Sequence, residues 1–291
     1  SGLTSITFSQ DSLLTSIGNY AFRDCWDLTS IAIPAGVTSI GLAAFQNASK
    51  LASITFSPDS LLTSIGSSAF YAASKLASIT IPAGVTSIGN YAFYQASGLT
   101  SITFSQGSLL TSIGNKAFQY ASGLTSITFS QCSLLTSIGD RAFQYASGLT
   151  SITFSQGSLL TSIGDYAFQY ASGLTSITIP ASIVSIGQHA FNGTGITNVL
   201  YNENNTMLVY YPPSLSDTSF PIPVSVTSIG SSAFNSASKL TSITIPSGVT
   251  SIGASAFQYA TGLTSIIIPA GVTSIGDYAF YNASKLASIT F

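Results

Sequence analysis

The hydrophobic and polar positions of the chain follow a pattern that recurs every 23 to 25 residues. A Ser-Ile-Gly motif marks each period, and an Ala-Phe pair follows it, so that a phenylalanine stands five residues after each marker isoleucine, as with Ile17 and Phe22. The motif occurs eleven times, and one interval, between Gly187 and Gly230, is longer at 43 residues. A fixed period of this length is typical of solenoids, in which each repeat adds one coil, so the pattern predicts one continuous array.

A second signature within each period predicts a short strand. Apolar residues stand at the first, fourth and sixth positions of the signature, as at Leu99, Ile102 and Phe104. Alternation of this kind with β-branched residues is typical of a strand that turns one side inward. Proline lacks the N–H group that a ladder needs, so it is expected to end the strand where it follows. It does so in five coils, at Pro34, Pro82, Pro180, Pro246 and Pro269.

The rest of each period predicts a second extended stretch and a corner. The stretch Val-Thr-Ser-Ile-Gly follows a turn, and we expect its glycine to permit a backbone bend that other residues resist. The Ala-Phe segment is expected to form one helical turn. Stacked coils then bury Leu, Ile, Phe, Val and Ala in a continuous core. The prediction is a β-rich leucine-rich-repeat solenoid of about 11–12 coils, in a single domain over residues 1–291.

The long interval predicts an insertion near residues 198–223. Two apolar and aromatic runs, 199–201 and 207–211, flank the Asn-rich segment 202–205. Two such runs around a turn of this composition favour a β-hairpin projecting from the stack.

Composition narrows the classes of function. The chain of 291 residues carries 7 basic and 9 acidic residues, and it has 53 Ser and 32 Thr. An ordinary soluble domain has about a quarter charged residues, so hydroxyl groups have replaced charge here. The 45% hydrophobic fraction excludes a disordered polyelectrolyte, and the few dispersed cations argue against nucleic-acid binding. No apolar run approaches the roughly 18 residues of a membrane span.

At this point the residues resemble a known family. The consensus Leu-Thr-Ser-Ile-Thr-Ile-Pro-Ala-Gly-Val-Thr-Ser-Ile-Gly-x-x-Ala-Phe resembles the BspA-like, Treponema-type leucine-rich repeat, and the inserted hairpin is similar to an irregular unit of that family. The resemblance covers residues 1–291. It implies a secreted or surface-anchored protein that acts in adhesion or host-protein binding, without catalysis. The family often has Cys three residues after the Phe, and Cys25 matches that position, which implies a packing role.

Candidate chemistry is sparse. His189, the single histidine, stands before Ala-Phe at the position that holds Tyr91 or Lys116 in other coils, so we interpret it as a surface residue. No Ser-His-Asp arrangement is specified, and we expect no enzyme, cofactor or metal. Acidic residues follow the marker glycine in some coils, and we interpret them as turn or helix-cap carboxylates rather than calcium ligands. These residues are Asp140, Asp165 and Asp277.

The two cysteines are not expected to pair. Cys25 and Cys132 lie about five coils apart, and a spacing of about 4.8 Å per coil separates them far beyond the ~7 Å limit of a disulfide. Cys132 replaces a glycine of a corner, where we expect an exposed thiol.

Three sets of surface residues are candidate contact or modification sites. Ser and Thr on the outward side of the strands form the first ladder, and tyrosines in successive coils form the second. The Ser/Thr rows suit a glycan, a protein strand or ice, but small polar residues are also what a tightly stacked sheet tolerates. The tyrosine row is a favourable contact surface, but packing along the solenoid edge explains it equally well. The ladders comprise Ser101, Thr103, Ser126, Thr128, Ser151, Thr153, Ser176 and Thr178, with Tyr120, Tyr145 and Tyr170. The third set is the N-glycosylation acceptors Asn47, Asn192, Asn204 and Asn282.

These observations favour a non-enzymatic extracellular or cell-surface scaffold for adhesion or for recognition of proteins or glycans. One alternative is a structural subunit of an extracellular fibre. The first and last segments share one repeat phase without a polar capping repeat, which suggests a longer array or head-to-tail self-association. A lesser alternative is ice binding by the Ser/Thr ladder. No partnership with nucleic acid and no membrane insertion are expected.

Overall fold

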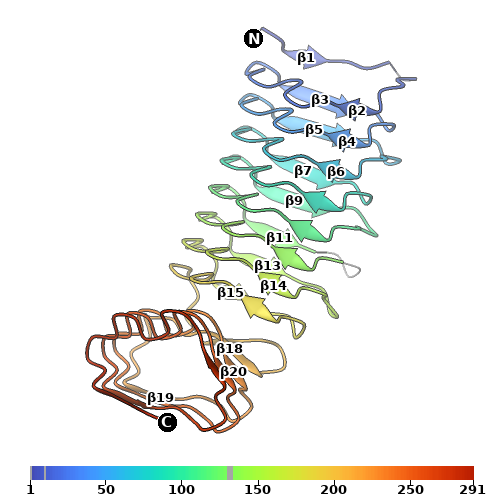
Figure 1. Ribbon diagram of the computed structural model, residues 1–291. Coiled ribbons are helices and arrows are strands. Elements are labelled where there is room, and N and C mark those ends of the chain that lie inside the picture. Colours follow the sequence, from blue (N-terminus) through green and yellow to red (C-terminus); the bar gives the residue numbers. More distant parts are fainter. Residues whose placement is uncertain (1, 10, 130–133) are drawn as a thin grey trace. The chain divides into compact units, whose positions relative to one another are not determined.

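The computed structural model describes residues 2–9, 11–129 and 134–291, and the chain divides into two compact units. Unit 1 comprises residues 1–178 and 191–195, and unit 2 comprises residues 179–190 and 196–291. Each unit is a stack of coils with parallel strands, visible as successive turns of the ribbon in Figure 1. The prediction of a β-solenoid is confirmed.

Each regular coil of unit 1 contributes a first strand of two to four residues, called the longer strand here, and a short strand of two residues. The longer strands are β1 (Ser5–Ile6), β3 (Ser30–Ile33), β5 (Ser53–Phe56), β7 (Ser78–Ile81), β9 (Ser101–Phe104), β11 (Ser126–Thr128), β13 (Ser151–Thr153) and β15 (Ser176–Ile177). The short strands are β2 (Ser16–Ile17), β4 (Ser39–Ile40), β6 (Ser64–Ile65), β8 (Ser87–Ile88), β10 (Ser112–Ile113), β12 (Ser137–Ile138) and β14 (Ser162–Ile163). Neighbouring strands pair in register, so that Ser101 stands beside Ser126 and Ile102 beside Ile127. Equivalent residues therefore form columns along the stack.

Unit 2 repeats this arrangement with one irregular segment. Its strands are β16 (Ser185–Ile186), β17 (Leu200–Tyr201), β18 (Met207–Tyr210), β19 (Ser219–Pro221), β20 (Ser228–Ile229), β21 (Ser242–Thr244), β22 (Ser251–Ile252), β23 (Ser265–Ile267), β24 (Ser274–Ile275) and β25 (Ser288–Thr290). One sheet has the order β17-β18-β20-β22-β24, and β19 pairs with β21 and β23 with β25.

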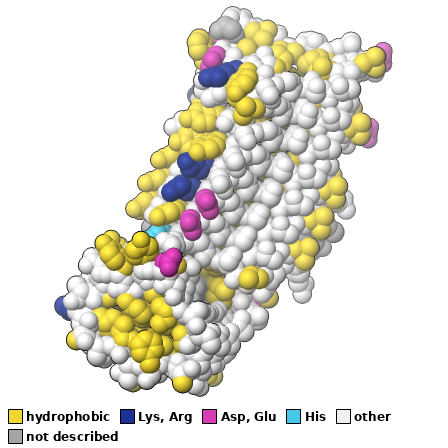
Figure 2. All heavy atoms as spheres, viewed as in Figure 1, with side chains coloured by type: hydrophobic (Ala, Val, Ile, Leu, Met, Phe, Trp, Pro, Cys, Tyr) yellow, Lys and Arg dark blue, Asp and Glu magenta, His cyan; other side chains and the backbone are white. Residues whose placement is uncertain are grey.

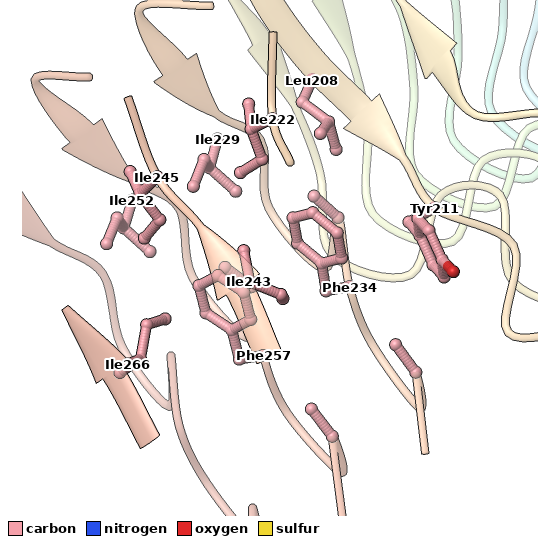
Figure 3. Close-up of a cluster of buried hydrophobic side chains, with 14 of the residues drawn as sticks. Leu208, Tyr211, Ile222, Ile229, Phe234, Ile243, Ile245, Ile252, Phe257 and Ile266 are labelled. Carbon is pink, nitrogen blue, oxygen red and sulfur yellow. The ribbon is translucent and has the colours of Figure 1, made fainter. Parts of the chain in front are cut away.

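The core is a set of columns of like side chains. In unit 1 the repeat phenylalanines stack on one another, with ring centroids 5.4 Å apart for Phe45 and Phe70 and 5.2 Å apart for Phe93 and Phe118. The central strand isoleucines are buried as well, as at Ile102. Figure 3 shows the equivalent cluster of unit 2, where Phe234 and Phe257 lie among isoleucines of both strand types. Each coil buries its apolar side only against its neighbours, as the repeat predicts.

The expected helical turn is wrong, because the described residues contain no helix. Residues two before and two after the repeat phenylalanine have left-handed backbone, with φ of 52° at Ala43 and 61° at Asn47. The Phe45 N–H donates to the Ala69 carbonyl of the next coil (2.8 Å), whereas the Gln46 N–H donates back to Ala43 (3.2 Å). Alternate backbone N–H groups thus donate to carbonyls of the neighbouring coil, and a right-handed helix cannot form.

The marker glycines serve close packing rather than a bend. No marker glycine has positive φ; the described glycines that do are Gly107, Gly157 and Gly193. A Cβ atom on Gly139 would lie 2.5 Å from Asn115 Oδ1 and 2.7 Å from Asn115 N in the preceding coil. The expectation of a special backbone bend is therefore wrong, and glycine recurs because two coils approach each other here.

The long interval contains the predicted hairpin, but the expectation that it projects from the stack is wrong, because its second strand is buried within the stack and adds one more coil. Strands β17 and β18 pair antiparallel, but β18 also pairs parallel with β20, so Leu208 stands beside the marker Ile229. The Tyr211 backbone N–H donates to the Ala233 carbonyl of the next coil (2.7 Å), in the same way as the N–H of each repeat phenylalanine. The ring centroids of Tyr211 and Phe234 lie 5.3 Å apart. Leu208 and Tyr211 thus replace the marker isoleucine and the phenylalanine, as Figure 3 shows.

Candidate functional site

The first candidate ladder lies on the outward side of the longer strands of unit 1. Ile102 of β9 is 4% exposed, and its neighbours Ser101 and Thr103 point the other way, toward solvent. The in-register pairing repeats this arrangement on β11 and β13 and at Ser176 of β15. The structure therefore brings the predicted Ser/Thr positions together in two parallel rows. This surface is called the long-strand face below.

The long-strand face is hollowed rather than flat. One hollow lies over β5 and β7 and is lined by Thr55 and Thr80, with Pro82 and Gln106 at its border. Others lie over β1 and β3 and over β9 and β11. Aromatic carbon of half-buried Phe56 borders the hydroxyl groups. The face thus offers hydrogen-bonding groups with small apolar surfaces between them.

Many other hydroxyl groups are engaged in holding coils together. Two columns of threonines, one before each strand type, donate their hydroxyls to backbone carbonyls of the preceding coil. Thr111 donates to Thr86 (2.9 Å) and Thr100 donates to Ala77 (2.9 Å). On the long-strand face, Thr103 instead bonds sideways to the Thr80 hydroxyl, at 2.9 Å, and remains exposed. The rich supply of Thr is therefore partly structural.

The tyrosine ladder forms a stack of rings at a corner of unit 1. Ring centroids lie 4.8 Å apart for Tyr120 and Tyr145 and 5.0 Å apart for Tyr145 and Tyr170, with interplanar angles of 6° and 24°. The ring of Tyr94 meets Tyr120 edge-on and extends the stack. Burial raises the pKa of Tyr94 above its ordinary value. The three candidate residues are between 37% and 47% exposed. Because the ring faces cover one another, this ladder presents ring edges and hydroxyls.

The acidic residues after the marker glycine act within the stack. Asn115 Oδ1 accepts the Asp140 N–H (2.9 Å), and Asp140 Oδ1 accepts the Asp165 N–H (2.9 Å) in the next coil. They are turn carboxylates, and the helix-cap part of the interpretation is wrong because no helix is present. The described residues hold no cluster of His, Cys, Asp and Glu suited to a metal. His189 is half-buried and has left-handed backbone, and its backbone N–H donates to the Ser232 hydroxyl oxygen (3.1 Å).

A model of the BspA type leucine rich repeat region matches residues 15–133, 86–212 and 209–291, in six copies. The chain belongs to the BspA-type leucine-rich repeat family. The predicted resemblance is confirmed, and such repeats are interaction scaffolds, in keeping with a non-enzymatic protein.

Solved structures of bacterial leucine-rich repeat proteins share the fold of this BspA-type chain. One from Bacteroides ovatus is 27% identical with a TM-score of 0.65, over 99% of this chain and 80% of that one. A leucine rich cell surface protein from Faecalibacterium prausnitzii is 29% identical with a TM-score of 0.56, over 95% and 83%. One from Eubacterium ventriosum is 26% identical with a TM-score of 0.50, over 92% and 61%. None of the curated proteins matches the chain.

The remaining candidates of this BspA-type protein differ in accessibility. Asn204 and Asn282 are exposed, whereas Asn192 is half-buried and the Asn47 side chain is half-buried and donates to Asp24 Oδ1 (2.8 Å). Cys25 is a free thiol buried in the core, and Cys132 lies outside the described residues. No helix in the described part of the chain is long and apolar enough to cross a membrane.

Proposed function

We propose that this protein is an extracellular or cell-surface scaffold that binds an extended protein segment or a glycan on the long-strand face. The observation that supports this proposal is the pairing of outward Ser/Thr rows with hollows along the same strands. Ser126 and Thr128 on β11, for example, border the hollow that they share with Ser101 and Thr103. Membership of a family of repeat scaffolds supports the non-enzymatic part of the proposal.

The chemistry of this face favours an uncharged polar partner. Each hydroxyl donates and accepts one or more hydrogen bonds, and the rows repeat at the strand spacing of about 4.8 Å. A sugar chain or an extended peptide offers hydrogen-bonding groups along its length. The hollow over β5 and β7 has no charged side chain among its lining residues. Because charge is absent there, binding is expected to depend little on salt concentration.

The test is a binding panel with a matched pair of variants. Immobilised protein is probed with extracellular-matrix proteins and with glycans, and saturable binding to at least one is expected. Arginines at Thr80, Thr103 and Thr128 are expected to abolish that binding. The control variant carries arginines at exposed corner positions of the same unit, Gln95, Ser147 and Ser172, and is expected to bind as the wild type does. A uniformly negative panel, or equal loss in both variants, overturns the proposal.

Two alternatives have assays of their own. The regular hydroxyl rows also suit ice, although a hollowed face matches a flat lattice less well than it matches an extended chain. Thermal hysteresis of the purified protein is the measurement for that alternative. Head-to-tail assembly into a fibre stays a prediction, and electron micrographs over a range of concentrations test it.

A further inference from the structure

Two hollows of the long-strand face occupy equivalent places two coils apart in unit 1. The first lies over β1 and β3, has a volume of about 490 Å³ and is lined by Pro34 and Ala35, among others. The second lies over β5 and β7, has a volume of about 530 Å³ and is lined by the equivalent Pro82 and Ala83. Ser57 lines both hollows, so they adjoin and form one row along the direction of stacking.

The hollows arise where corners of different length alternate between the two strands of successive coils. From the last apolar residue of the strand signature to the marker isoleucine, the chain takes seven residues in the coils of β3 and β7 and nine in those of β1, β5 and β9. Ser57 and Gln106, from two of the long corners, line the second hollow beside Pro82 of the short corner between them. A short corner between two long ones therefore leaves a recess at every second coil.

The spacing of this row determines which conformation a partner needs in order to follow it. Adjacent strands lie about 4.8 Å apart, so the two hollows are about 9.6 Å apart. A polyproline II helix has three residues per turn and rises about 3.1 Å per residue, so its side chains recur on one side every ~9.3 Å. In a β-strand they recur every second residue, at about 6.6–6.8 Å, which places the next side chain on the wall between the hollows. A polyproline II segment therefore fits the row, and a β-strand does not.

The lining of the hollows suits such a segment chemically. Half-buried Phe8 and Phe56 supply aromatic carbon, and Pro34 and Pro82 add further apolar surface. Aromatic-lined grooves of this kind accept the apolar side chains of proline-rich segments. The polyproline II backbone has no internal hydrogen bonds, so its carbonyls can accept hydrogen bonds from exposed hydroxyls such as that of Thr55. Because the segment crosses the strands, it needs no ladder with them.

Acidic residues on the long corners indicate the charge of the partner. Asp11 and Asp59 occupy equivalent positions in the corners after β1 and β5, and both are exposed. The corresponding position after β9 holds Gly107, so the acids accompany the hollows. Figure 2 shows acidic side chains at the right-hand edge of unit 1, apart from the basic ones. The two acids are also two coils apart, so cationic side chains at every third residue of the segment complement both.

We propose that the hollows over β1–β3 and β5–β7 bind a basic, proline-rich segment of another protein in the polyproline II conformation. One apolar side chain enters the first hollow and another, three residues along the segment, enters the second, while Lys or Arg side chains lie near Asp11 and Asp59. This inference rests on the proposed binding to the long-strand face and specifies the partner. Exposed ion pairs contribute little, so the acids discriminate between basic and acidic segments without making binding strongly salt-dependent.

Fluorescence anisotropy of labelled peptides tests the proposal. Four repeats of Leu-Pro-Lys place Leu at every third position, and each proline keeps the Leu before it extended. Three repeats of Leu-Pro-Lys-Ala have the same length but place Leu at every fourth position. The first peptide is expected to bind saturably and at least about tenfold more tightly than the second, because only the first fills both hollows. Four repeats of Leu-Pro-Glu are expected to bind about threefold to tenfold more weakly than the Leu-Pro-Lys peptide.

A filled-hollow variant relates the binding to this row. Ala32→Gln with Thr80→Gln places a larger uncharged side chain in each hollow and is expected to weaken binding of the Leu-Pro-Lys peptide about tenfold. Both positions are exposed, so far-UV circular dichroism should match the wild type. The matched control, Ser147→Gln with Ser172→Gln, alters exposed corner positions and is expected to bind as the wild type does.

A charge-reversed variant tests the acids separately. Asp11→Lys with Asp59→Lys is expected to bind the Leu-Pro-Glu peptide more tightly than the Leu-Pro-Lys peptide. Absence of saturable peptide binding, equal binding of the two Leu spacings, binding unaffected by filled hollows, or an unchanged charge preference overturns the proposal. A panel ligand that binds the long-strand face while no peptide binds overturns this inference alone. A uniformly negative panel without peptide binding overturns the proposed function as well.

Discussion

Replacing the marker glycine Gly139 by alanine is expected to destabilise unit 1 severely. The added Cβ would lie 2.5 Å from Asn115 Oδ1, 2.7 Å from Asn115 N and 2.8 Å from the Gly114 carbonyl carbon. Two of these are backbone atoms that no rotamer change can move away, so the coils must separate locally. Separation weakens two bonds between coils, from the Gly139 N–H to Ile113 (2.8 Å) and from the Asp140 N–H to Asn115 Oδ1 (2.9 Å).

The size of the effect follows from these contacts. Overpacking of a close-packed site costs about 1–3 kcal/mol, and each weakened hydrogen bond adds about 1 kcal/mol. The expected loss in the free energy of unfolding is therefore about 3–5 kcal/mol. Gly18→Ala is the matched control, because the same motif position in the first coil has no atom within 4 Å of the added Cβ. Its change is expected to stay within about 1 kcal/mol.

Denaturant unfolding followed by far-UV circular dichroism measures both variants. Hydrogen exchange with mass spectrometry then locates the weakened coils, which should be those on either side of Gly139. Equal stability of Gly139→Ala and Gly18→Ala would refute the close-approach explanation for the recurrent glycine.

Three further predictions use other features of the stack. Ala72 has left-handed backbone (φ 56°), so Ala72→Gly should stabilise the protein by about 0.5–1 kcal/mol. The neighbouring Ala73 is buried, so Ala73→Gly should destabilise it by about 1.5 kcal/mol. The two variants should therefore shift the melting temperature in opposite directions. Burial and the hydrogen bond to Asp217 raise the pKa of Tyr211, so the folded state keeps a proton that the unfolded state loses near pH 10. The free energy of unfolding should therefore fall above about pH 10. Unfolding curves at about pH 8 and 11 should show a smaller fall for Tyr211→Phe than for the wild type. Thr111→Val removes one hydroxyl bond between coils (2.9 Å) and should lower stability by about 0.5–1 kcal/mol, and an unchanged melting temperature would contradict a structural role for that column.

The sequence alone predicted the coils, the two strands of each coil and the outward Ser/Thr rows. Period and alternation suffice for these features because each coil has the same neighbours as the next. Ser101 and Thr103 could be placed on the solvent side simply because Ile102 between them must be buried.

Other features depend on contacts between coils that a single repeat does not reveal. The Ala-Phe segment was expected to form a helical turn, but hydrogen bonds such as that from the Phe45 N–H to the Ala69 carbonyl of the next coil take donors that a helix would need. The extra coil escaped recognition because Leu208 and Tyr211 are three residues apart, whereas the marker and the phenylalanine are five apart.

The in-register ladders also determine how unit 1 would respond to mechanical force. Hydrogen bonds such as those from Thr63 to Thr38 and from Gly89 to Ile65 join each coil to the one before it and run along the direction of stacking. Tension applied to the chain at one end of the stack loads the bonds of the terminal coil first, rather than sharing the load among all coils. A coil of 23 to 25 residues releases about 80 Å of extended chain when it peels away. The stack would therefore lengthen one coil at a time.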